Sequence, residues 1–353
     1  MRLLTINPGS TSTKIAVYDD TTPVLAESIA HSVEELSRFA RVSDQFEYRR
    51  DLVLDVLRRH DIPLQFDAVV GRGGLLKPIE GGVYEVNDVM LSEMEHPLRN
   101  HACNLGCRMA ADIAGRIPGC RALTADPGVV DELEDVARVS GSPLLPRITT
   151  WHALNQRAIG RRYAAQIGRK YEELNLVVAH LGGGISIGAH RRGRCIDVNN
   201  AFDGEGPFSP ERAGTLPSGS LIDLCYSQRY TREQLKRRIS GNAGLAAHLG
   251  TTDVAQIVRN IEAGDKKAEL VLGAMIYQVS KSIGAAAVAL CGEVDAILLT
   301  GGVSHSVYVT DRVRGRVEFI APVYIFPGED EMLALALNGK GALEGTIPVK
   351  EYK

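Results

Sequence analysis

The stretch LLTINPGSTSTKIAVYDD at residues 3–20 has a counterpart in LVVAHLGGGISIGAHRRG at residues 176–193. Aligning the two segments places Asn7 opposite His180. Each consists of an apolar strand, a polar residue, a turn of small residues and a second strand. Two copies are too few for a solenoid, so the repeat predicts a duplicated domain; the alternative is chance similarity between two glycine-rich hairpins.

Composition narrows the class of protein. The chain has 353 residues, enough for two ordinary domains, with 44% hydrophobic and 24% charged residues. The net charge of -3 lacks the basic footprint of a protein that binds nucleic acid or an acidic membrane. The N-terminus enters a strand directly, without the segments of a signal peptide. The six cysteines show no CxxC or zinc spacing and predict free thiols, so we expect a cytoplasmic protein.

Apolar strand-like runs alternate with helical patterns along the chain, which predicts α/β architecture. One helix is expected from Val33 to Arg59, behind a serine cap. The most apolar stretch, Ala268 to Leu290, carries two charged residues and is expected to be a buried helix, not a membrane span. Two prolines precede a helix near Ala153 and mark residues 145–152 as a candidate domain junction.

Three turns of small residues follow predicted strands and suit an anion. Residues 7–14 (NPGSTSTK) offer an amide, four hydroxyl groups and a lysine. Residues 180–187 (HLGGGISI) and 300–304 (TGGVS) contain successive glycines, whose missing Cβ atoms let a ligand approach the backbone. None matches the Walker or GxGxxG patterns, and each alone could be an ordinary turn. Together they predict a site for the phosphates of a nucleotide.

Seven motifs occur in the order found in one kinase family. They are NPGSTSTK at 7–14, GRGGLLKPIEGGVY at 71–84, DPGVVDELEDVARVSGSP at 126–143, HALNQRAI at 152–159, HLGGGISI at 180–187, DVNNAFDGEGPFSPERAGTLP at 197–217 and LLTGGV at 298–303. With these motifs, over nearly its whole length, the chain resembles the acetate kinase family of the acetate and sugar kinase, heat-shock ATPase and actin superfamily.

The resemblance implies an α/β fold of two duplicated ribonuclease-H-like (actin-like ATPase) domains with a nucleotide cleft between them. The expected domains are residues 1–149 plus about 334–353, and residues 150–333. The implied cofactors are ATP and Mg²⁺, and the implied reaction is reversible phosphorylation of a short-chain carboxylate, with butyrate the expected acceptor. A branched-chain or other short acid is the alternative. The expected assembly is a homodimer or a higher homo-oligomer.

The expected chemistry is transfer between two anions. A carboxylate acceptor is ionised at pH 7 and needs no general base, so the site should be rich in cations. Arg72 lies among glycines after a strand and is one candidate cation. By resemblance, the catalytic residues are Arg72, Asp126, His152 and Arg212. Those expected to bind the nucleotide are Asn7, Ser10, Ser12, Lys14, His180, Gly182, Gly183, Gly184, Gly301 and Gly302.

The resemblance assigns the metal to Asp126 and Glu331, with Glu329 and Asp330 as rivals for the second position. Each assignment has an ordinary alternative. An aspartate before proline often starts a turn, an acidic helix N-terminus is favourable by itself, and a lone histidine usually serves packing. The apolar residues Leu75 to Val83, which follow Arg72, are expected to line the acyl pocket unless they only pack the core.

Two other functions remain open from the sequence. A sugar or alcohol kinase of the same superfamily would use Asp126 as a general base, because a hydroxyl acceptor must lose its proton. A nucleotide-gated binding module of the heat-shock or actin kind would hydrolyse ATP slowly and transfer nothing. The fold alone does not separate these options.

Overall fold

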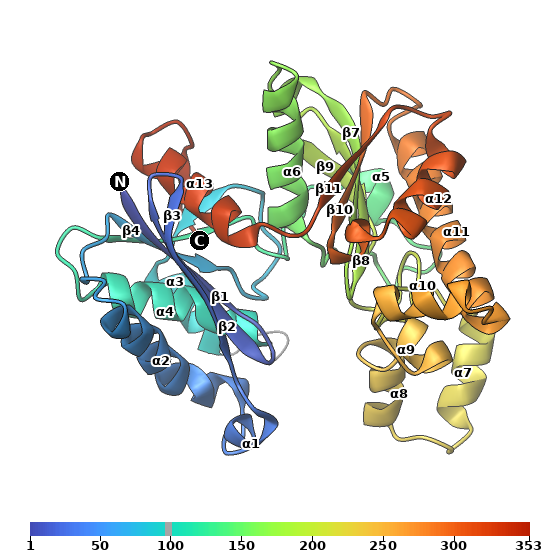
Figure 1. Ribbon diagram of the computed structural model, residues 1–353, viewed down its shortest axis with the longest axis horizontal. Helices are drawn as coiled ribbons and strands as arrows, with labels where there is room; N and C mark the ends of the chain where they lie inside the picture. Colours follow the sequence, from blue (N-terminus) through green and yellow to red (C-terminus); the bar gives the residue numbers. More distant parts are fainter. Residues whose placement is uncertain (96–100) are drawn as a thin grey trace. The chain divides into compact units, whose positions relative to one another are not determined.

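The computed structural model describes residues 1–95 and 101–353, which form two compact units (Figure 1). Unit 1 comprises residues 1–130 and 330–353, and unit 2 comprises residues 131–329. Unit 2 is therefore inserted in sequence between the two segments of unit 1.

The segment 131–149, which the sequence analysis placed in the first domain, groups with unit 2. Its ion pairs account for this grouping. Arg157 and Glu132 form a buried pair at 3.0 Å, and Arg147 lies 2.9 Å from Asp197. A buried pair is costly to break, so these contacts hold the segment on unit 2.

Among the described residues, unit 1 contains a seven-stranded sheet with the spatial order β12-β5-β6-β4-β1-β2-β3. The strands are β1 (Arg2–Pro8), β2 (Ser12–Asp19), β3 (Thr22–Ala30), β4 (Ala68–Arg72), β5 (Val83–Glu85), β6 (Arg121–Ala125) and β12 (Val349–Lys350). Strands β1, β4 and β6 are parallel neighbours, whereas β1-β2 and β2-β3 are antiparallel. Residues of β1 and β4 are buried on both faces, as expected of parallel strands covered by helices.

Unit 2 contains a five-stranded sheet with the order β11-β10-β7-β8-β9. The strands are β7 (Asn175–Leu181), β8 (Ile185–Arg191), β9 (Arg194–Val198), β10 (Ala296–Gly301) and β11 (Val323–Pro327). Strands β7-β8 and β8-β9 are antiparallel, and β10 is parallel to both β7 and β11. This is the pattern of β1 to β4 and β6 in unit 1, so the structure confirms the duplication predicted from the two hairpins.

Helices cover both faces of the unit 1 sheet. They are α1 (Val33–Leu36), η1 (Val42–Gln45), α2 (Phe46–Arg59), α3 (Asp88–Glu95), η2 (Ala102–Asn104), α4 (Leu105–Ala114) and α13 (Glu331–Leu343). Helices α2 and α4 pack on the face of Leu4 and Val69. Helix α13 packs on the opposite face, where Gly339 lies against Val70.

The single helix expected from Val33 to Arg59 is wrong, because the chain forms α1, η1 and α2 instead. Helix α1 is a single turn whose start is capped, because Ser32 and Glu35 form a reciprocal capping box. No residue of α1 is buried, so no packing extends this turn into α2.

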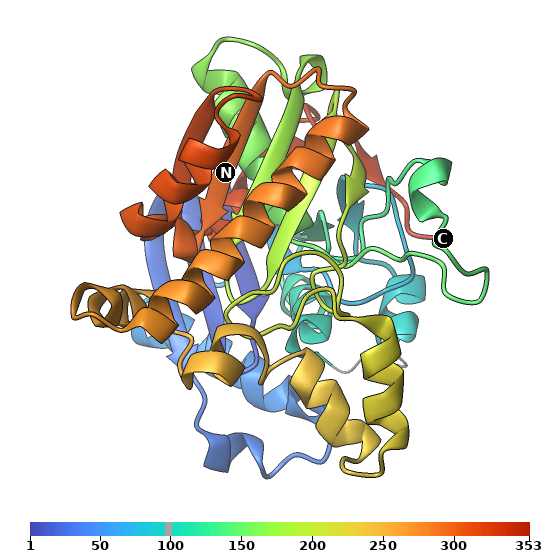
Figure 2. The same cartoon turned by 90° about the vertical axis from the view of Figure 1, so that its right-hand side faces the viewer.

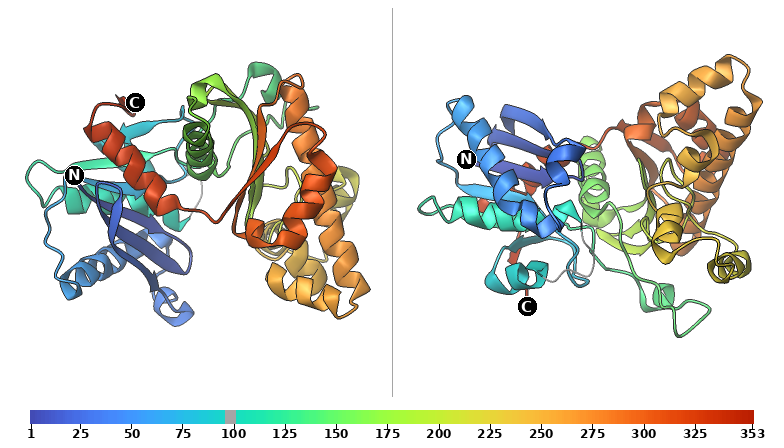
Figure 3. Two further views of the ribbon diagram at one scale, coloured as in Figure 1. Left: turned by 45° about the horizontal axis from the view of Figure 1, so that its top comes forward. Right: turned by 90° about the horizontal axis from the view of Figure 1, so that it is seen from below.

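The helices of unit 2 lie on both faces of its sheet and beyond one end of it (Figure 1 and Figure 3). They are α5 (Asp135–Arg138), α6 (Ala153–Gln166), η3 (Tyr171–Glu173), α7 (Ser218–Tyr226), α8 (Arg232–Ile239), α9 (Gly244–Leu249), α10 (Val254–Glu262), α11 (Lys266–Ala289), η4 (Gly302–His305) and α12 (Val307–Val317). Helix α6 packs on one face, while α11 and α12 pack on the other.

Helix α11 is the buried apolar helix expected from the sequence, and it runs along the sheet of unit 2 (Figure 2). In length and composition it could span a membrane. Its residues Leu272, Met275 and Val279, however, are buried in the core with the strands β7 and β8. Packing of this kind is that of a core helix.

Candidate functional site

Three site residues of unit 1 lie at one edge of its sheet. Asn7 is near the end of β1, Arg72 ends β4, and Asp126 follows β6 directly. Because the three strands are parallel neighbours, their carboxyl ends meet at this edge. The edge therefore brings together an amide, a guanidinium group and a carboxylate that are far apart in the sequence.

Glu331 joins this group from the first turn of α13. Its Oε2 atom accepts hydrogen bonds from Asn7 Nδ2 at 2.6 Å and from Arg72 Nη1 at 2.5 Å. Its side chain is only 8% exposed, so the ion pair with Arg72 is well shielded from water. Of the rival carboxylates, Asp330 occupies the N-cap position of α13 without a capping hydrogen bond from its side chain, and Glu329 lies in unit 2 beside His180.

Asp126 is held in a constrained conformation. Its φ angle is +40°, which is unusual for a residue with a side chain. Its Oδ1 atom accepts the Gly82 N–H at 2.8 Å, and its own N–H donates to the Gly82 carbonyl at 3.0 Å. Strained backbone that is fixed by hydrogen bonds on both sides is often found at functional sites.

The glycines around Arg72 allow close packing of the backbone. A Cβ on Gly71 would overlap the Gly106 carbonyl of α4, and a Cβ on Gly73 would lie 2.5 Å from the Pro127 side chain. The motif therefore brings β4 against α4 and against the turn that carries Asp126.

The two leucines after Arg72 contact the same small core cluster but differ in how deeply they are buried. Leu76 is buried in a small core cluster with Tyr84 and Tyr352, as a packing residue would be. Leu75 is only partly buried, and its N–H donates to the Asn104 side chain at 2.8 Å. Leu75 is therefore the better of the two for contact with a ligand.

The hairpin of β1 and β2 carries Ser10 in its turn, and Ser12 and Lys14 in the first residues of β2. Ser10 and Lys14 are exposed and Ser12 is half-buried, so their polar groups are accessible. The turn is closed by a hydrogen bond of 2.7 Å from the Gly9 N–H to the Ser12 carbonyl.

The side chain of Arg49 in α2 binds the backbone of this turn. The guanidinium donates to the carbonyl groups of Gly9 at 2.8 Å, Ser12 at 3.2 Å and Ser10 at 3.3 Å. Arg49 is fully buried, and burial lowers the pKa of its guanidinium. Burial, together with the charge of Arg49, also lowers the pKa of the neighbouring His31 to about 4.

In unit 2, the glycine loop between β7 and β8 packs against the segment that carries Arg212. A Cβ on Gly184 would overlap the Arg212 guanidinium, whose Nη1 donates to the Ala201 carbonyl at 2.6 Å. Ser209 donates to the Gly183 carbonyl at 2.5 Å. Burial lowers the pKa of Arg212. The missing Cβ of Gly184 thus places a guanidinium directly against the loop.

His152 and His180 lie face to face. Their ring centroids are 3.7 Å apart and the rings differ by 7° in plane. His180 Nδ1 contacts Asn155 Oδ1 at 2.8 Å, and His180 Nε2 lies 3.1 Å from Glu329 Oε1. Gly182 adjoins this pair, since a Cβ there would lie 2.9 Å from His180 Nε2. The two expected histidines are therefore brought together beside the glycine loop.

Gly301 and Gly302 lie at the same edge of the unit 2 sheet as His180, because Thr300 pairs with His180 across parallel strands. Gly301 has a φ angle of +90°, and a Cβ there would collide with Leu181. A Cβ on Gly302 would meet nothing within 4 Å. Gly301 is thus required by the backbone, whereas Gly302 faces open space.

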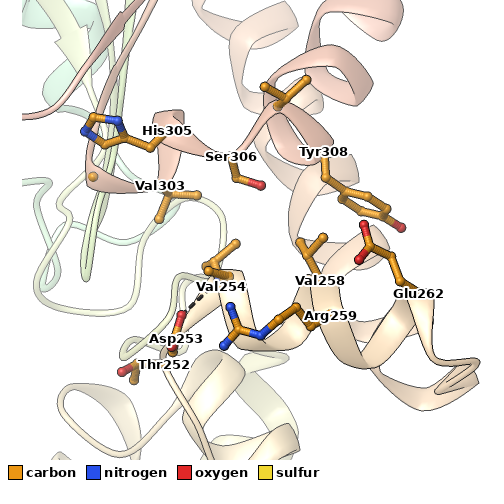
Figure 4. Close-up of a pocket in the computed structure, with 13 residues that line it drawn as sticks. Thr252, Asp253, Val254, Val258, Arg259, Glu262, Val303, His305, Ser306 and Tyr308 are labelled. Atoms are coloured by element: carbon orange, nitrogen blue, oxygen red, sulfur yellow. Dashed lines mark hydrogen bonds between the residues drawn. The ribbon is translucent and has the colours of Figure 1, made fainter.

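That space is a pocket of about 770 Å³ (Figure 4). Apolar side chains and polar groups from along α10 and from the start of α12 converge on it, with η4 at one side. Its lining includes Asp253, Val254, Val258, Arg259, Val303 and Tyr308. Apart from Val303, which belongs to the TGGVS turn, the sequence analysis missed these residues, because no motif marks residues 252–262 and only the fold brings them to Gly302.

Among the described residues, no three His, Cys, Asp or Glu side chains are grouped as a metal site. The two carboxylates expected to hold a metal, Asp126 and Glu331, both lie in unit 1. Mg²⁺ commonly binds through one or two carboxylates, water and substrate phosphates, so two carboxylates fit its requirements.

Comparisons with known proteins agree with these features. Residues 147–325 match the model of the Acetokinase family. The chain is 63% identical to a "Probable butyrate kinase" of Bacteroides thetaiotaomicron, over 100% of both chains. It is 50% identical to "Butyrate kinase 2" of Clostridium acetobutylicum, over 100% of this chain and 99% of the relative. Among solved structures, an acetate kinase of Porphyromonas gingivalis has a similar fold, with a TM-score of 0.74, 19% identity, and 94% of this chain and 97% of that chain covered.

Proposed function

The chain belongs to the acetokinase family, as its motifs predicted, and we propose that it transfers the γ-phosphoryl group of ATP reversibly to butyrate, giving ADP and butyryl phosphate. The observation that supports this most directly is the cluster of Asn7, Arg72 and Glu331 at the edge of the unit 1 sheet. It supplies a positioned guanidinium group, which suits an anionic acceptor. The choice of butyrate follows the names of the two relatives.

Arg72 binds the acceptor carboxylate in this proposal. Glu331 and Asn7 fix its guanidinium before the substrate arrives, so little reorganisation is needed during transfer. The acceptor is already ionised, so Asp126 does not have to remove a proton. Positioning and charge neutralisation then account for most of the catalysis.

The residues proposed to bind the nucleotide belong to both units. The adenosine part occupies the pocket beside Gly302, whose mixed apolar and polar lining suits a purine and a ribose. The phosphates bind the glycine loop of residues 182–184 and the turn that carries Ser10, Ser12 and Lys14.

Asp126 and Glu331 would hold Mg²⁺ through their carboxylate oxygens or through intervening water. When bound, it neutralises charge on the phosphates of ATP. His152 donates a hydrogen bond to the phosphoryl group in transfer, and Arg212 adds positive charge beside Gly184.

A homodimer or larger homo-oligomer is proposed for the assembly. No residue of α7 is buried, although the helix carries the sequence SGSLIDLCY. Its Ile222 and Tyr226 are 58% and 84% exposed, which is unusual for large apolar side chains grouped on one helix. The proposed compartment is the cytoplasm, since all six cysteines are free thiols.

One assay tests the function. The protein is incubated with ATP, Mg²⁺, hydroxylamine and acids of two to six carbons, including branched acids, and hydroxamate is measured. Butyrate should give the highest kcat/KM. Preference for a branched acid would reassign the acceptor, and phosphorylation of glycerol or a hexose without hydroxamate would favour an alcohol kinase.

A further inference from the structure

A chain of polar side chains runs through the core of unit 2 and ends at His152. Tyr171 Oη contacts His190 Nδ1 at 2.6 Å, and His190 Nε2 contacts Gln156 Oε1 at 2.9 Å. Gln156 Nε2 reaches Ser186 Oγ at 2.8 Å, and Ser186 Oγ contacts His152 Nδ1 at 2.9 Å. The first four residues are no more than 2% exposed, and His152 is half-buried.

The backbone carbonyl group of Ser186 determines which groups in this chain donate hydrogen bonds and which accept them. Gln156 also donates to the carbonyl oxygen of Ser186 at 3.0 Å. A carbonyl oxygen can only accept, so the amide atom that faces it must be Nε2. The Gln156 oxygen therefore faces His190, whose Nε2 must carry a proton and donate it.

The protons of Gln156 and Ser186 also determine which ring nitrogen of His152 accepts a hydrogen bond. Both protons of the Gln156 amide are used, one on the Ser186 carbonyl and one on Ser186 Oγ. The Ser186 hydroxyl accepts from Gln156 and from the backbone N–H of His152 at 3.4 Å, so both of its acceptor positions are filled and its own proton is left to donate. That proton points to His152 Nδ1, which is then the acceptor nitrogen of the ring.

The buried end of the chain agrees with this direction. Burial lowers the pKa of His190 to about 3, so its ring is neutral and has one donor and one acceptor nitrogen. Burial raises the pKa of Tyr171, so its hydroxyl stays protonated and donates to His190 Nδ1. Gly188 keeps space for the network, because a Cβ there would lie 2.6 Å from Gln156 Oε1.

We propose that Ser186, Gln156 and His190 are positioning residues that hold His152 in the tautomer with its proton on Nε2. The inference rests on the proposed function in one respect, namely that His152 faces a phosphoryl group. The oxygens of a phosphoryl group only accept hydrogen bonds, so a bare Nε2 lone pair would repel them. The stack on His180 sets the plane of the ring, and Ser186 sets which nitrogen carries the proton.

The tautomer can be observed without any turnover. The full-length protein is labelled with ¹⁵N-histidine, and the His152 signals are assigned from their loss in His152→Gln. Protonated and bare ring nitrogens differ in chemical shift, so Nε2 of His152 should report a bound proton and Nδ1 a lone pair. A proton on Nδ1 in the unsubstituted protein would overturn the proposal.

Variants then test the residues that act through His152. Ser186→Ala should shift His152 towards a mixture of tautomers and lower kcat about tenfold, a typical loss when a partner that orients a histidine is removed. The KM values for ATP and butyrate should change little, because binding contacts remain. Gln156→Leu should act in the same direction, and Ser186→Thr, which keeps a hydroxyl, should retain the tautomer.

The matched control is Ser280→Ala, which removes a buried serine hydroxyl that bonds the Ile276 carbonyl in α11. This control should leave kcat and the His152 spectrum unchanged. If Ser186→Ala had no more effect on the spectrum than Ser280→Ala, the proposal would fail. A correct tautomer in a protein that forms no hydroxamate would instead refute the proposed function alone.

Discussion

Replacing Arg49 with methionine should destabilise unit 1 and weaken ATP binding together. Methionine fills much of the same volume but donates no hydrogen bonds. The change leaves the carbonyl groups of Gly9, Ser10 and Ser12 without the guanidinium that binds them. Each such bond contributes about 1–3 kcal/mol, and water can replace part of it on a turn that is partly exposed.

Removing the charge also removes the cost of burying it, so the free energy of unfolding should fall by about 2–3 kcal/mol in total. For a unit of about 150 residues this lowers the Tm by roughly 4–12 °C. The KM for ATP should rise about tenfold, because the turn with Ser10 and Ser12 is no longer held in one conformation. Thermal unfolding and steady-state kinetics measure the two effects.

The control is Arg58→Met on the same helix, since the Arg58 side chain is 76% exposed. It should change the Tm by no more than about 1 °C, as expected of a surface substitution. If Arg49→Met matched this control in both Tm and KM, the turn would not depend on Arg49. A lower Tm with an unchanged KM would limit Arg49 to a structural role.

Three further outcomes are expected. Gly184→Ala should lower kcat at least tenfold by displacing Arg212, whereas Gly273→Ala, whose Cβ meets nothing within 4 Å, should not. The free energy of unfolding should fall as the pH drops from about 6.5 to 4, because His31 binds a proton in the unfolded chain but, with a pKa of about 4, stays neutral in the folded protein. Denaturant titrations at several pH values should show that the free energy of unfolding of His31→Asn depends less steeply on pH. Along the acids from acetate to butyrate, kcat/KM should rise roughly fourfold per methylene, and a flat series, or one indifferent to Leu75→Ala, would place the acyl pocket elsewhere.

The fold was accessible from the sequence because the duplicated hairpins recur with nearly equal bounds. Strands β1 and β7 begin and end at positions that the alignment of Asn7 with His180 makes equivalent. The break between α1 and α2 was missed because apolar spacing alone does not report where packing ends. Only the solvent exposure of α1 explains why the helical pattern from Val33 does not continue.

For the candidate site, motifs indicated which residues to examine but not their partners. The ion pair of Arg72 with Glu331 joins positions that only the sheet topology brings together. Gln156 is part of the motif HALNQRAI, yet its role depends on the Ser186 carbonyl of strand β8. Arg49 had no signal at all, since a single arginine on an amphipathic helix looks like a surface residue.

The position of α13 late in the sequence has a consequence for how the protein matures on the ribosome. Strands β1, β4 and β6 are synthesised before unit 2, but α13, which covers the face that includes Val70, comes after it. At typical rates of translation the delay is roughly 10–40 s. During that time a nascent chain exposes an apolar sheet face, and Arg72 lacks the carboxylate of Glu331. A chain interrupted within unit 2 should therefore be both inactive and prone to recognition by chaperones and proteases, so that premature termination yields no partly working enzyme.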